Sequence, residues 1–484
     1  MTYTIEAIEL YVRETPPGRM PFRLGRELDS DVPPVPLTSP LGHVRLVLSD
    51  GAGNTTFGCA ADRLSVRWLD KREGRTRKRK LSELVPLIEQ ARDVFVSQQR
   101  FTTPFEMWRR CHPLIEEAGK ARGQEPLTSA FASALLERAV LDAVCRLEGR
   151  PFAGCVHDDR LGIEPGLIHR ELAGTRMADW LPPRPAERIA IRHTIGLDDP
   201  LDDADLSPMG RVGDGLPETL VDYIREDGLK YFKVKVSGDA RRDVERLGRL
   251  WDVLPKTPQT AVTLDANESY DDLEGLAWFV DRLESEVAGL FQHIVWIEQP
   301  LPRGLALDPA AGKRLKRIAE KKPLIIDESD AEFDAFRRAL DIGYAGTSHK
   351  NCKGVYKSLL NYALAGYHRI RGRETVISAE DLQNLPVVPL QQDFATVALL
   401  GIEHCERNGH HYNYGLSMLS AADKENAARY HPDLYVKRGD EYFLRIEDGY
   451  VSCDSLQVPG FGVAAEPDWN SMLPMRRWLG GVVG

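Results

Sequence analysis

Four apolar runs near the middle of the chain carry charged residues at or next to their ends. Lys233 and Lys235 lie in the first run, and the next three runs close on Asp265, Glu298 and Asp327. The runs recur roughly every 30 residues, which is the length of one strand and its returning helix. In a parallel β/α barrel the strand ends share one mouth, so we expect the three carboxylates to converge there. Converging carboxylates need a cation to balance their charge.

The donor set indicates magnesium. Carboxylates are hard oxygen ligands, and a site with only three of them leaves positions for water and substrate oxygens, which suits Mg²⁺ better than Ca²⁺ in an all-protein cage. The neighbouring sequence contains no cluster of His and Cys that would indicate zinc. A single acid at a strand end is commonly a helix N-cap or a solvated turn residue, but three at matched strand ends favour a functional site.

The lysines add base chemistry to this mouth. Side chains alternate along a strand, so Lys233 and Lys235 share one face, and the apolar residues between and beside them share the other. Two ammonium groups are therefore expected beside the acids. A lysine among other cationic groups loses part of its preference for the charged form and can then act as a base near neutral pH.

A β/α barrel and a second domain must position these residues. A chain of 484 residues with 42% hydrophobic content can bury one barrel of about 250 residues and a further domain. We predict an α/β fold in which residues 186–439 form a (β/α)8-type barrel, the catalytic domain. Residues 1–165 alternate short strands with helices, which predicts an α+β capping domain. The Pro-rich segment 181–185 is the predicted linker between the two.

The sequence around these residues resembles the enolase superfamily, and within it the mandelate racemase and muconate-lactonizing enzyme branch. The matching segments are GLKYFKVKVSG (228–238), LDAN (264–267), WIEQPL (296–301), IDES (326–329) and KNCKG (350–354). Residues 139–151 resemble the helix that joins the family's cap to its barrel, and residues 459–463 resemble the tail that returns to the cap. The resemblance implies a modified TIM barrel with an N-terminal α+β capping domain, completed by the C-terminal tail, residues 440–484.

Carried over residue by residue, the resemblance implies that Mg²⁺ is held by Asp265, Glu298 and Asp327. Lys235 would be a general base on one face of the substrate. Lys350, in the place of the lysine that ends the sixth strand, would act on the opposite face, and Lys233 would orient or polarise the substrate. Removing a proton α to a carboxylate builds negative charge on the carboxylate oxygens, which a divalent cation stabilises.

The chain also departs from the family's pattern. The mandelate racemase type uses a His paired with an Asp, but the expected seventh-strand segment 375–381 contains no His, so a Lys/Lys arrangement is the better match. His349 replaces a usually apolar residue before Lys350, which leaves Lys353 as the alternative. Glu403 falls where some relatives place an eighth-strand Glu that contacts substrate, and a buried salt-bridge partner is its other interpretation.

Substrate specificity is expected to lie in loops of the cap. In the family such loops close over the barrel, and here they correspond to residues 14–27 and 50–62. Arg23, with Arg19 in the same loop, would meet an anionic distal group of the substrate, and an exposed solubilising role is the alternative. Asn267 in the LDAN segment is a further candidate for substrate contact.

Composition argues against several classes of partner. The formal net charge of −10 and the pI near 5.7 argue against nucleic acid and an anionic membrane. The basic run 71–80 lacks interleaved aromatic residues and is more simply a solvated loop or a helix start. Seven cysteines without a CxxC pair predict reduced thiols, and residues 1–6 show no signal sequence, so we expect a cytoplasmic enzyme. The polar stretch 406–439 would be an inserted lid or a contact in a homo-oligomer.

The leading hypothesis is an Mg²⁺-dependent enzyme that abstracts the proton α to the carboxylate of a small molecule and forms an enolate. Racemisation or epimerisation is the favoured outcome, because two lysines can flank the α-carbon. A dehydratase or a cycloisomerase stays open, since a β-leaving group would turn the same enolate into an elimination product. A non-catalytic metal-binding barrel is the alternative of another class, and Lys235 and Lys350 weigh against it.

Overall fold

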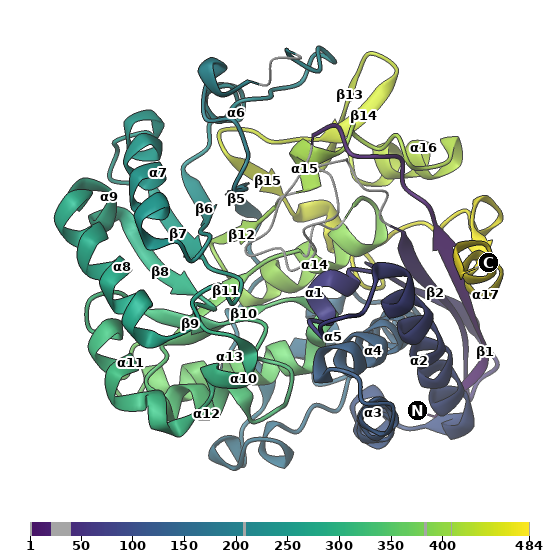
Figure 1. Ribbon diagram of the computed structural model, residues 1–484. Coiled ribbons are helices and arrows are strands. Elements are labelled where there is room, and N and C mark those ends of the chain that lie inside the picture. The colour runs from purple at the N-terminus through teal and green to yellow at the C-terminus, as the bar shows by residue number, and fades with distance from the viewer. Residues whose placement is uncertain (1, 21–39, 207–209, 382–384, 408, 484) are drawn as a thin grey trace.

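Eight parallel strands form the wall of a barrel that helices surround (Figure 1). The computed structural model describes residues 2–20, 40–206, 210–381, 385–407 and 409–483. Neighbouring strands pair in chain order from β5 to β11, and β12 pairs with β5. A parallel bridge between Glu380 and Glu406 joins the end of β11 to β12 and closes the ring. The strands are β5 (Arg188–Ile195), β6 (Tyr231–Lys235), β7 (Ala261–Asp265), β8 (Ile294–Glu298), β9 (Leu324–Ile326), β10 (Gly346–His349), β11 (Val376–Ala379) and β12 (His404–Glu406).

Each barrel helix turns an apolar face to the strands. In α7 (Ala240–Val253) the buried residues include Val244, Leu247 and Leu250, whose spacing of three places them on one helix face. The side chain of Asp239 accepts a hydrogen bond from the backbone N–H of Arg242 and so caps the helix. The other main helices of this layer are α6 (Leu220–Asp227), α8 (Leu273–Glu286), α11 (Gly312–Ala319), α12 (Ala335–Ile342), α13 (Val355–Arg369) and α14 (Val388–Leu400).

The N-terminal part forms an antiparallel sheet with helices beside it. β1 (Tyr3–Arg13), β2 (Leu41–Asp50) and β3 (Thr55–Arg63) pair in this order. Residues 50–62, expected as a loop over the barrel, instead form the turn and most of β3, because this strand pairs with β2 along its whole length. Gly58 of β3 lies so close to a helix that an added Cβ would overlap the Ala139 carbonyl oxygen. The helices are α2 (Arg77–Gln98), α3 (Pro104–Ala121) and α4 (Pro126–Leu147), of which α4 carries Ala139.

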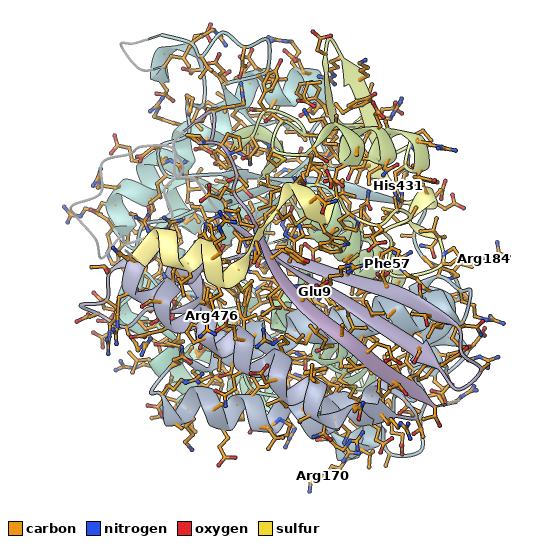
Figure 2. All side chains as sticks on the ribbon, turned by 90° about the vertical axis from the view of Figure 1, so that its right-hand side faces the viewer. Glu9, Phe57, Arg170, Arg184, His431 and Arg476 are labelled. Atoms are coloured by element: carbon orange, nitrogen blue, oxygen red, sulfur yellow. The ribbon has the colours of Figure 1, made fainter. Side chains whose placement is uncertain are left out.

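The C-terminal segment reaches both parts of the molecule. β15 (Tyr450–Ser452) pairs antiparallel with the barrel strand β5, whereas β16 (Leu473–Pro474) pairs with β1 of the cap sheet. The last helix, α17 (Met475–Val483), runs beside α2 (Figure 2). Arg476 of α17 lies 3.7 Å from Glu89 of α2. The predicted domain bounds at residues 165, 186 and 440 stay predictions.

The polar insertion contacts the cap. It contains α15 (Gly409–Tyr412), α16 (Ala421–Tyr430) and the strand β13 (Tyr435–Arg438), which pairs with β14 (Glu441–Leu444). Arg13, the last residue of β1, donates to Asp423 of α16 at 2.6 Å, and both residues are buried. The insertion therefore fastens the barrel side of the molecule to the cap sheet. Its role as a lid or an oligomer contact stays a prediction.

Three smaller expectations concern surface and composition. The basic run 71–80 contains the start of α2, whose N-cap Thr76 accepts a hydrogen bond from the N–H of Arg79, in keeping with a helix start. All seven cysteines are buried free thiols. No helix in the described ranges has both the length and the apolar character that crossing a bilayer requires.

Candidate active site at the barrel mouth

Charged side chains from seven barrel strands meet at one end of the barrel. β6, β7, β8 and β12 contribute residues within the strand, while β9, β10 and β11 contribute the residue that follows the strand. Every member is at most 5% exposed. The members are Lys233, Lys235, Asp265, Glu298, Asp327, Lys350, Glu380 and Glu406. Sequence reasoning identified six of these eight residues.

Lys233 lies at the centre of the cluster. Its Nζ is 3.0 Å from carboxylate oxygens of Asp265 and Glu298, 3.2 Å from Glu380 and 2.7 Å from Glu406. Burial alone would lower the pKa of Lys233, but these carboxylates raise it well above the usual range of lysine. Four carboxylates surround this one ammonium group, an arrangement that suits orientation or polarisation of a substrate.

The two other predicted lysines come from opposite sides. Lys235 belongs to β6 and Lys350 follows β10, the second and sixth strands of the closed ring, so they face each other across it. The Nζ of Lys235 lies 2.6 Å from Asp265, and that of Lys350 lies 2.6 Å from Asp327 and 2.7 Å from Glu380. Burial lowers the pKa of each lysine, but the carboxylates outweigh it and leave both pKa values raised.

Three acids of the cluster fit a divalent cation. Glu298, Asp327 and Glu380 each offer a carboxylate oxygen, and these oxygens lie within 4.8 Å of one another. Oε2 of Glu298 is buried and has no hydrogen-bond partner. Burial raises the pKa of Glu298 well above its usual range, and Lys233 offsets only part of that effect. An uncompensated carboxylate oxygen beside two further acids is the environment that a hard cation such as Mg²⁺ would satisfy.

Asp265 differs from the other two predicted metal ligands. Its carboxylate pairs with Lys235 at 2.6 Å and with Lys233 at 3.0 Å. Burial would raise the pKa of Asp265, but the two ammonium groups outweigh it and lower the pKa to about 2. Among the described residues, Glu380 rather than Asp265 joins Glu298 and Asp327 in the compact acidic group. The ligand role of Asp265 stays a prediction.

Glu380 and Glu406 are the members that sequence reasoning missed. Glu380 follows β11 and Glu406 ends β12, so both obey the same rule of a charged residue at a strand end that identified the other acids. The family's pattern instead directs attention to a His on the seventh strand, which this chain lacks, and to Glu403 near the eighth. Glu403 is exposed, precedes β12 and accepts a hydrogen bond from the hydroxyl of Tyr231 at the start of β6. The structure therefore places Glu403 at the other end of the barrel.

Two further predicted residues lie at the rim of the cluster. Asn267 is buried, and its amide Nδ2 donates to Glu328 at 3.0 Å. Lys353, the alternative to Lys350, donates to the carboxylate of Asp327 at 3.0 Å and to its carbonyl oxygen at 3.2 Å. Lys353 thus supports Asp327, whereas Lys350 also reaches Glu380 at the end of the neighbouring strand β11.

Of the two predicted arginines, Arg19 lies among the described residues. Arg23 lies outside the described residues. Arg19 of the same predicted loop is described, and its guanidinium donates to Asp214 at 2.7 Å and to the His411 carbonyl oxygen at 2.9 Å. The Arg19 side chain is therefore committed to the protein itself.

Comparisons with known proteins agree with this architecture. Residues 216–379 match the family model described as enolase C-terminal domain-like. The chain is similar to the L-Lys-D/L-Arg epimerase of Methylococcus capsulatus, with 36% identity over 195 residues, which covers 34% of this chain and 50% of that protein. The chain thus spans about half the length of this curated relative.

Two solved structures share the fold over nearly the whole chain. One is an enolase from Bradyrhizobium complexed with magnesium and mandelic acid, with a TM-score of 0.57, 16% identity and coverage of 97% of this chain and 98% of that one. The other is a dipeptide epimerase from Methylococcus capsulatus complexed with Mg and the dipeptide L-Arg-D-Lys, with a TM-score of 0.55, 18% identity and coverage of 96% and 100%. Together with the family match, they confirm the predicted barrel with an N-terminal capping domain.

Proposed function

We propose that this chain, whose residues 216–379 match the family model described as enolase C-terminal domain-like, is an Mg²⁺-dependent racemase or epimerase that acts α to a carboxylate. The observation that carries the proposal is the placement of Lys235 and Lys350 on opposite strands, each against a carboxylate of one buried acidic cluster. A binding protein would have no need for two bases about one metal site.

Glu298 and Asp327 would hold the metal, and we assign Asp265 as the third ligand. These three acids come from the adjacent strand ends β7, β8 and β9, and Asp265 and Glu298 both lie 3.0 Å from Lys233 Nζ. Glu380 is the competing third ligand. When bound there, a divalent cation would neutralise carboxylates that now raise the lysine pKa values and would stabilise negative charge on the substrate's carboxylate oxygens.

The chain's own residues move the protons. Lys235, as the free amine, takes the α-proton of one stereoisomer, and the electron pair of the broken C–H bond moves into the carboxylate to give an enolate. Lys350, as the ammonium, returns a proton to the α-carbon from the opposite face. For the other isomer the two lysines exchange roles. Lys233 keeps its charge throughout and orients the substrate carboxylate, and the burial of all three lysines keeps bulk water from the carbanionic carbon.

Dipeptides are the substrate class that we infer first. The curated relative is named an L-Lys-D/L-Arg epimerase, and a dipeptide epimerase is among the structures with the same fold. The α-carbon next to a dipeptide's carboxylate carries the acidified proton that the two lysines require. Elimination or cycloisomerisation would need only one of the two lysines, so the two-sided arrangement favours epimerisation.

Isotope exchange tests this proposal. The protein with Mg²⁺ is incubated in D₂O with a panel of dipeptides that carry cationic, anionic and apolar residues, and with mandelate, and α-deuterium is followed by ¹H NMR and mass spectrometry. We expect deuterium in both stereoisomers of at least one member, loss of exchange on chelation and recovery when Mg²⁺ is restored. Exchange in one isomer only, with an elimination product, would favour a dehydratase. Metal binding without exchange of any member would favour the non-catalytic barrel.

A further inference from the structure

One of the two proposed proton-transfer lysines touches the capping domain. The Nζ of Lys350 lies 4.2 Å from the centre of the Trp68 ring, and Trp68 belongs to α1 (Val66–Leu69), a short helix between the cap sheet and the barrel (Figure 1). Lys350 also pairs with Asp327 and Glu380. Its ammonium is therefore held by two barrel carboxylates and one aromatic face from the cap, and a buried indole attracts an ammonium at this distance.

The barrel rim fixes the Trp68 ring. Trp68 is 5% exposed, and its Nε1 donates to Oε1 of Glu328 at 3.1 Å. Asn267 donates to the same oxygen at 3.0 Å. Glu328 lies just beyond β9 and Asn267 just beyond β7, so the rim around the acidic cluster sets the edge of the indole and thereby the direction of its face.

Arg303 holds α1, the helix that carries this ring, in place. Its guanidinium donates to the carbonyl oxygens of Trp68 and Leu69 at 3.1 and 3.3 Å. The same group makes two bonds of 2.9 Å to Glu268 and one of 3.2 Å to Glu125, the N-cap residue of α4. Charged hydrogen bonds of this kind are directional, so α1 is held on the rim in one orientation rather than by apolar packing alone.

Lys235 stands in a different environment. Its ammonium pairs with Asp265 at 2.6 Å and with Glu406 at 3.8 Å, and both carboxylates belong to the barrel. We propose that Trp68 is a positioning residue for Lys350, through which the cap sets the ammonium of one lysine while the barrel alone sets the other. This inference rests on the proposed two-lysine reaction and adds to it a functional asymmetry between the two faces of the substrate.

Stereospecific exchange is the readout, because a merely structural role of Trp68 would not change the exchange of one isomer selectively. Trp68→Leu should slow α-deuterium exchange of the isomer that Lys350 deprotonates by about 10-fold or more, as expected for loss of one desolvated cation–π contact. Exchange of the other isomer should stay within about 2-fold. Trp68→Phe, which keeps an aromatic face, should recover most of the lost rate. Leu69→Ala, which removes a buried side chain from the same helix, is the matched control and should slow neither isomer selectively.

A substrate-independent measurement tests the contact itself. The field of a nearby ammonium shifts indole fluorescence, so Lys350→Met should change the tryptophan emission of the wild-type protein and of Leu69→Ala, but not that of Trp68→Phe. An emission change that survives in Trp68→Phe would overturn the contact. Equal slowing of both isomers in Trp68→Leu would overturn the positioning role. If the wild-type protein exchanges no member of the panel, the proposed function fails and the role of Trp68 in it falls as well.

Discussion

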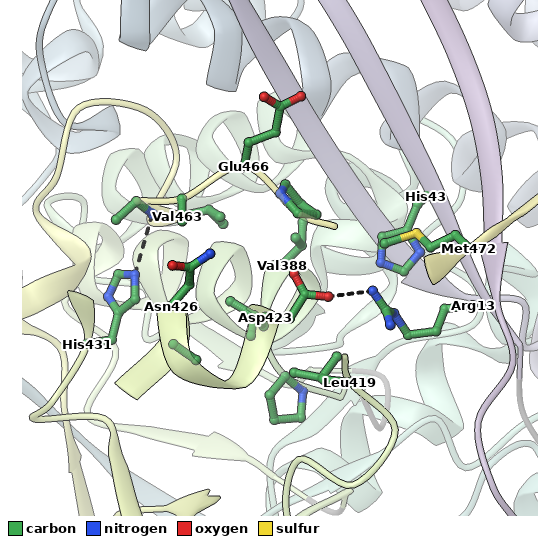
Figure 3. Close-up of a pocket in the computed structure, with 16 residues that line it drawn as sticks. Arg13, His43, Val388, Leu419, Asp423, Asn426, His431, Val463, Glu466 and Met472 are labelled. Atoms are coloured by element: carbon green, nitrogen blue, oxygen red, sulfur yellow. Dashed lines mark hydrogen bonds and ion pairs between the residues drawn. The ribbon is translucent and has the colours of Figure 1, made fainter. Parts of the chain in front are cut away.

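Two regions of this molecule bury charge, and they do so in different ways. In the pocket between β1, α16 and the C-terminal segment, Arg13 faces Asp423 at 2.6 Å (Figure 3). The second oxygen of Asp423 accepts the N–H of Asp468 at 2.9 Å. At the barrel mouth, Lys233 alone contacts four carboxylates, and Oε2 of Glu298 has no hydrogen-bond partner. In the pocket both carboxylate oxygens of Asp423 have a donor, whereas the mouth leaves a carboxylate oxygen of Glu298 for a ligand.

The contrast distinguishes a charge pair that holds parts of the fold together from a charge cluster that serves function. The Arg13–Asp423 pair joins elements that are far apart in the chain, and the pocket around it is lined largely by apolar residues such as Val388, Val463 and Met472. A buried ion pair of this kind holds parts together because either partner alone would be an uncompensated buried charge. The mouth holds more carboxylate oxygens than the protein's own hydrogen bonds and ion pairs satisfy. Such buried acids lower stability unless a cation and a substrate bind to them.

The largest effect is expected in the pocket. Arg13→Met should lower the free energy of unfolding by about 3–5 kcal/mol, because it leaves Asp423 buried without its cation. Urea denaturation measures this loss, and the double variant Arg13→Met with Asp423→Leu should recover most of it. Mg²⁺ affinity should be unchanged in both. A large loss of Mg²⁺ binding with normal stability would erase the distinction between the two regions.

At the mouth, Glu298→Gln should act on the metal rather than on the fold. Loss of this carboxylate should weaken Mg²⁺ binding, measured by titration calorimetry, by on the order of 100-fold, at least the cost of removing a supporting outer-shell partner. Stability should change little, because the variant removes a buried charge whose pKa burial already raises. Glu403→Gln is the matched control at the other end of the barrel, and an equal effect there would contradict the assignment.

A pair of variants sharpens the choice of the third ligand. Asp265→Asn is expected to weaken Mg²⁺ binding about 10-fold more than Glu380→Gln, since Asp265 lies beside Glu298 on the adjacent strand, whereas Glu380 follows β11, which neighbours neither β8 nor β9. The reverse order of the two affinities would assign the ligand role to Glu380.

The smallest effect concerns pH and returns to the pocket. Burial, with Arg13 nearby, lowers the pKa of His43 to about 3, below the value of about 6.5 for an unfolded histidine. The stability that follows from keeping His43 neutral is present above pH 6.5 and is lost as the pH falls toward 3. Between pH 6 and 5, wild-type protein should lose about 1 kcal/mol more unfolding free energy than His43→Gln. Parallel curves for the two proteins would show that His43 does not contribute.

The sequence predicted the barrel and most of its mouth because a strand that ends on a charge repeats at a fixed interval. Lys235, Asp265 and Glu298 are the last residues of their strands, so their position in the sequence already fixes where they lie. The eighth strand has only three residues, and Glu406 at its end could not be distinguished from Glu403 just before it until pairing with β5 set the register.

Contacts between distant segments were beyond sequence reasoning. Arg13 and Asp423 are separated by 410 positions, and neither residue type nor spacing indicates that they meet. Nothing in the sequence distinguishes Trp68 from other aromatic residues of the core, and only the docking of α1 on the barrel rim brings it to Lys350. Tertiary geometry, rather than local pattern, determines such pairs.

The central claim is that Lys235 and Lys350 serve opposite faces of one substrate carbon, and single-turnover exchange in D₂O tests it most directly. Each purified stereoisomer of an exchanging substrate is given to Lys235→Ala and Lys350→Ala. The control is Lys230→Ala, because Lys230 directly precedes β6, at the opposite end of the strand from Lys235, and pairs with Asp448. Each active-site variant should lose exchange with one isomer, a different one in each case, by on the order of 1,000-fold, and both should lose net epimerisation. Full turnover by Lys350→Ala would show instead that the enzyme uses one base.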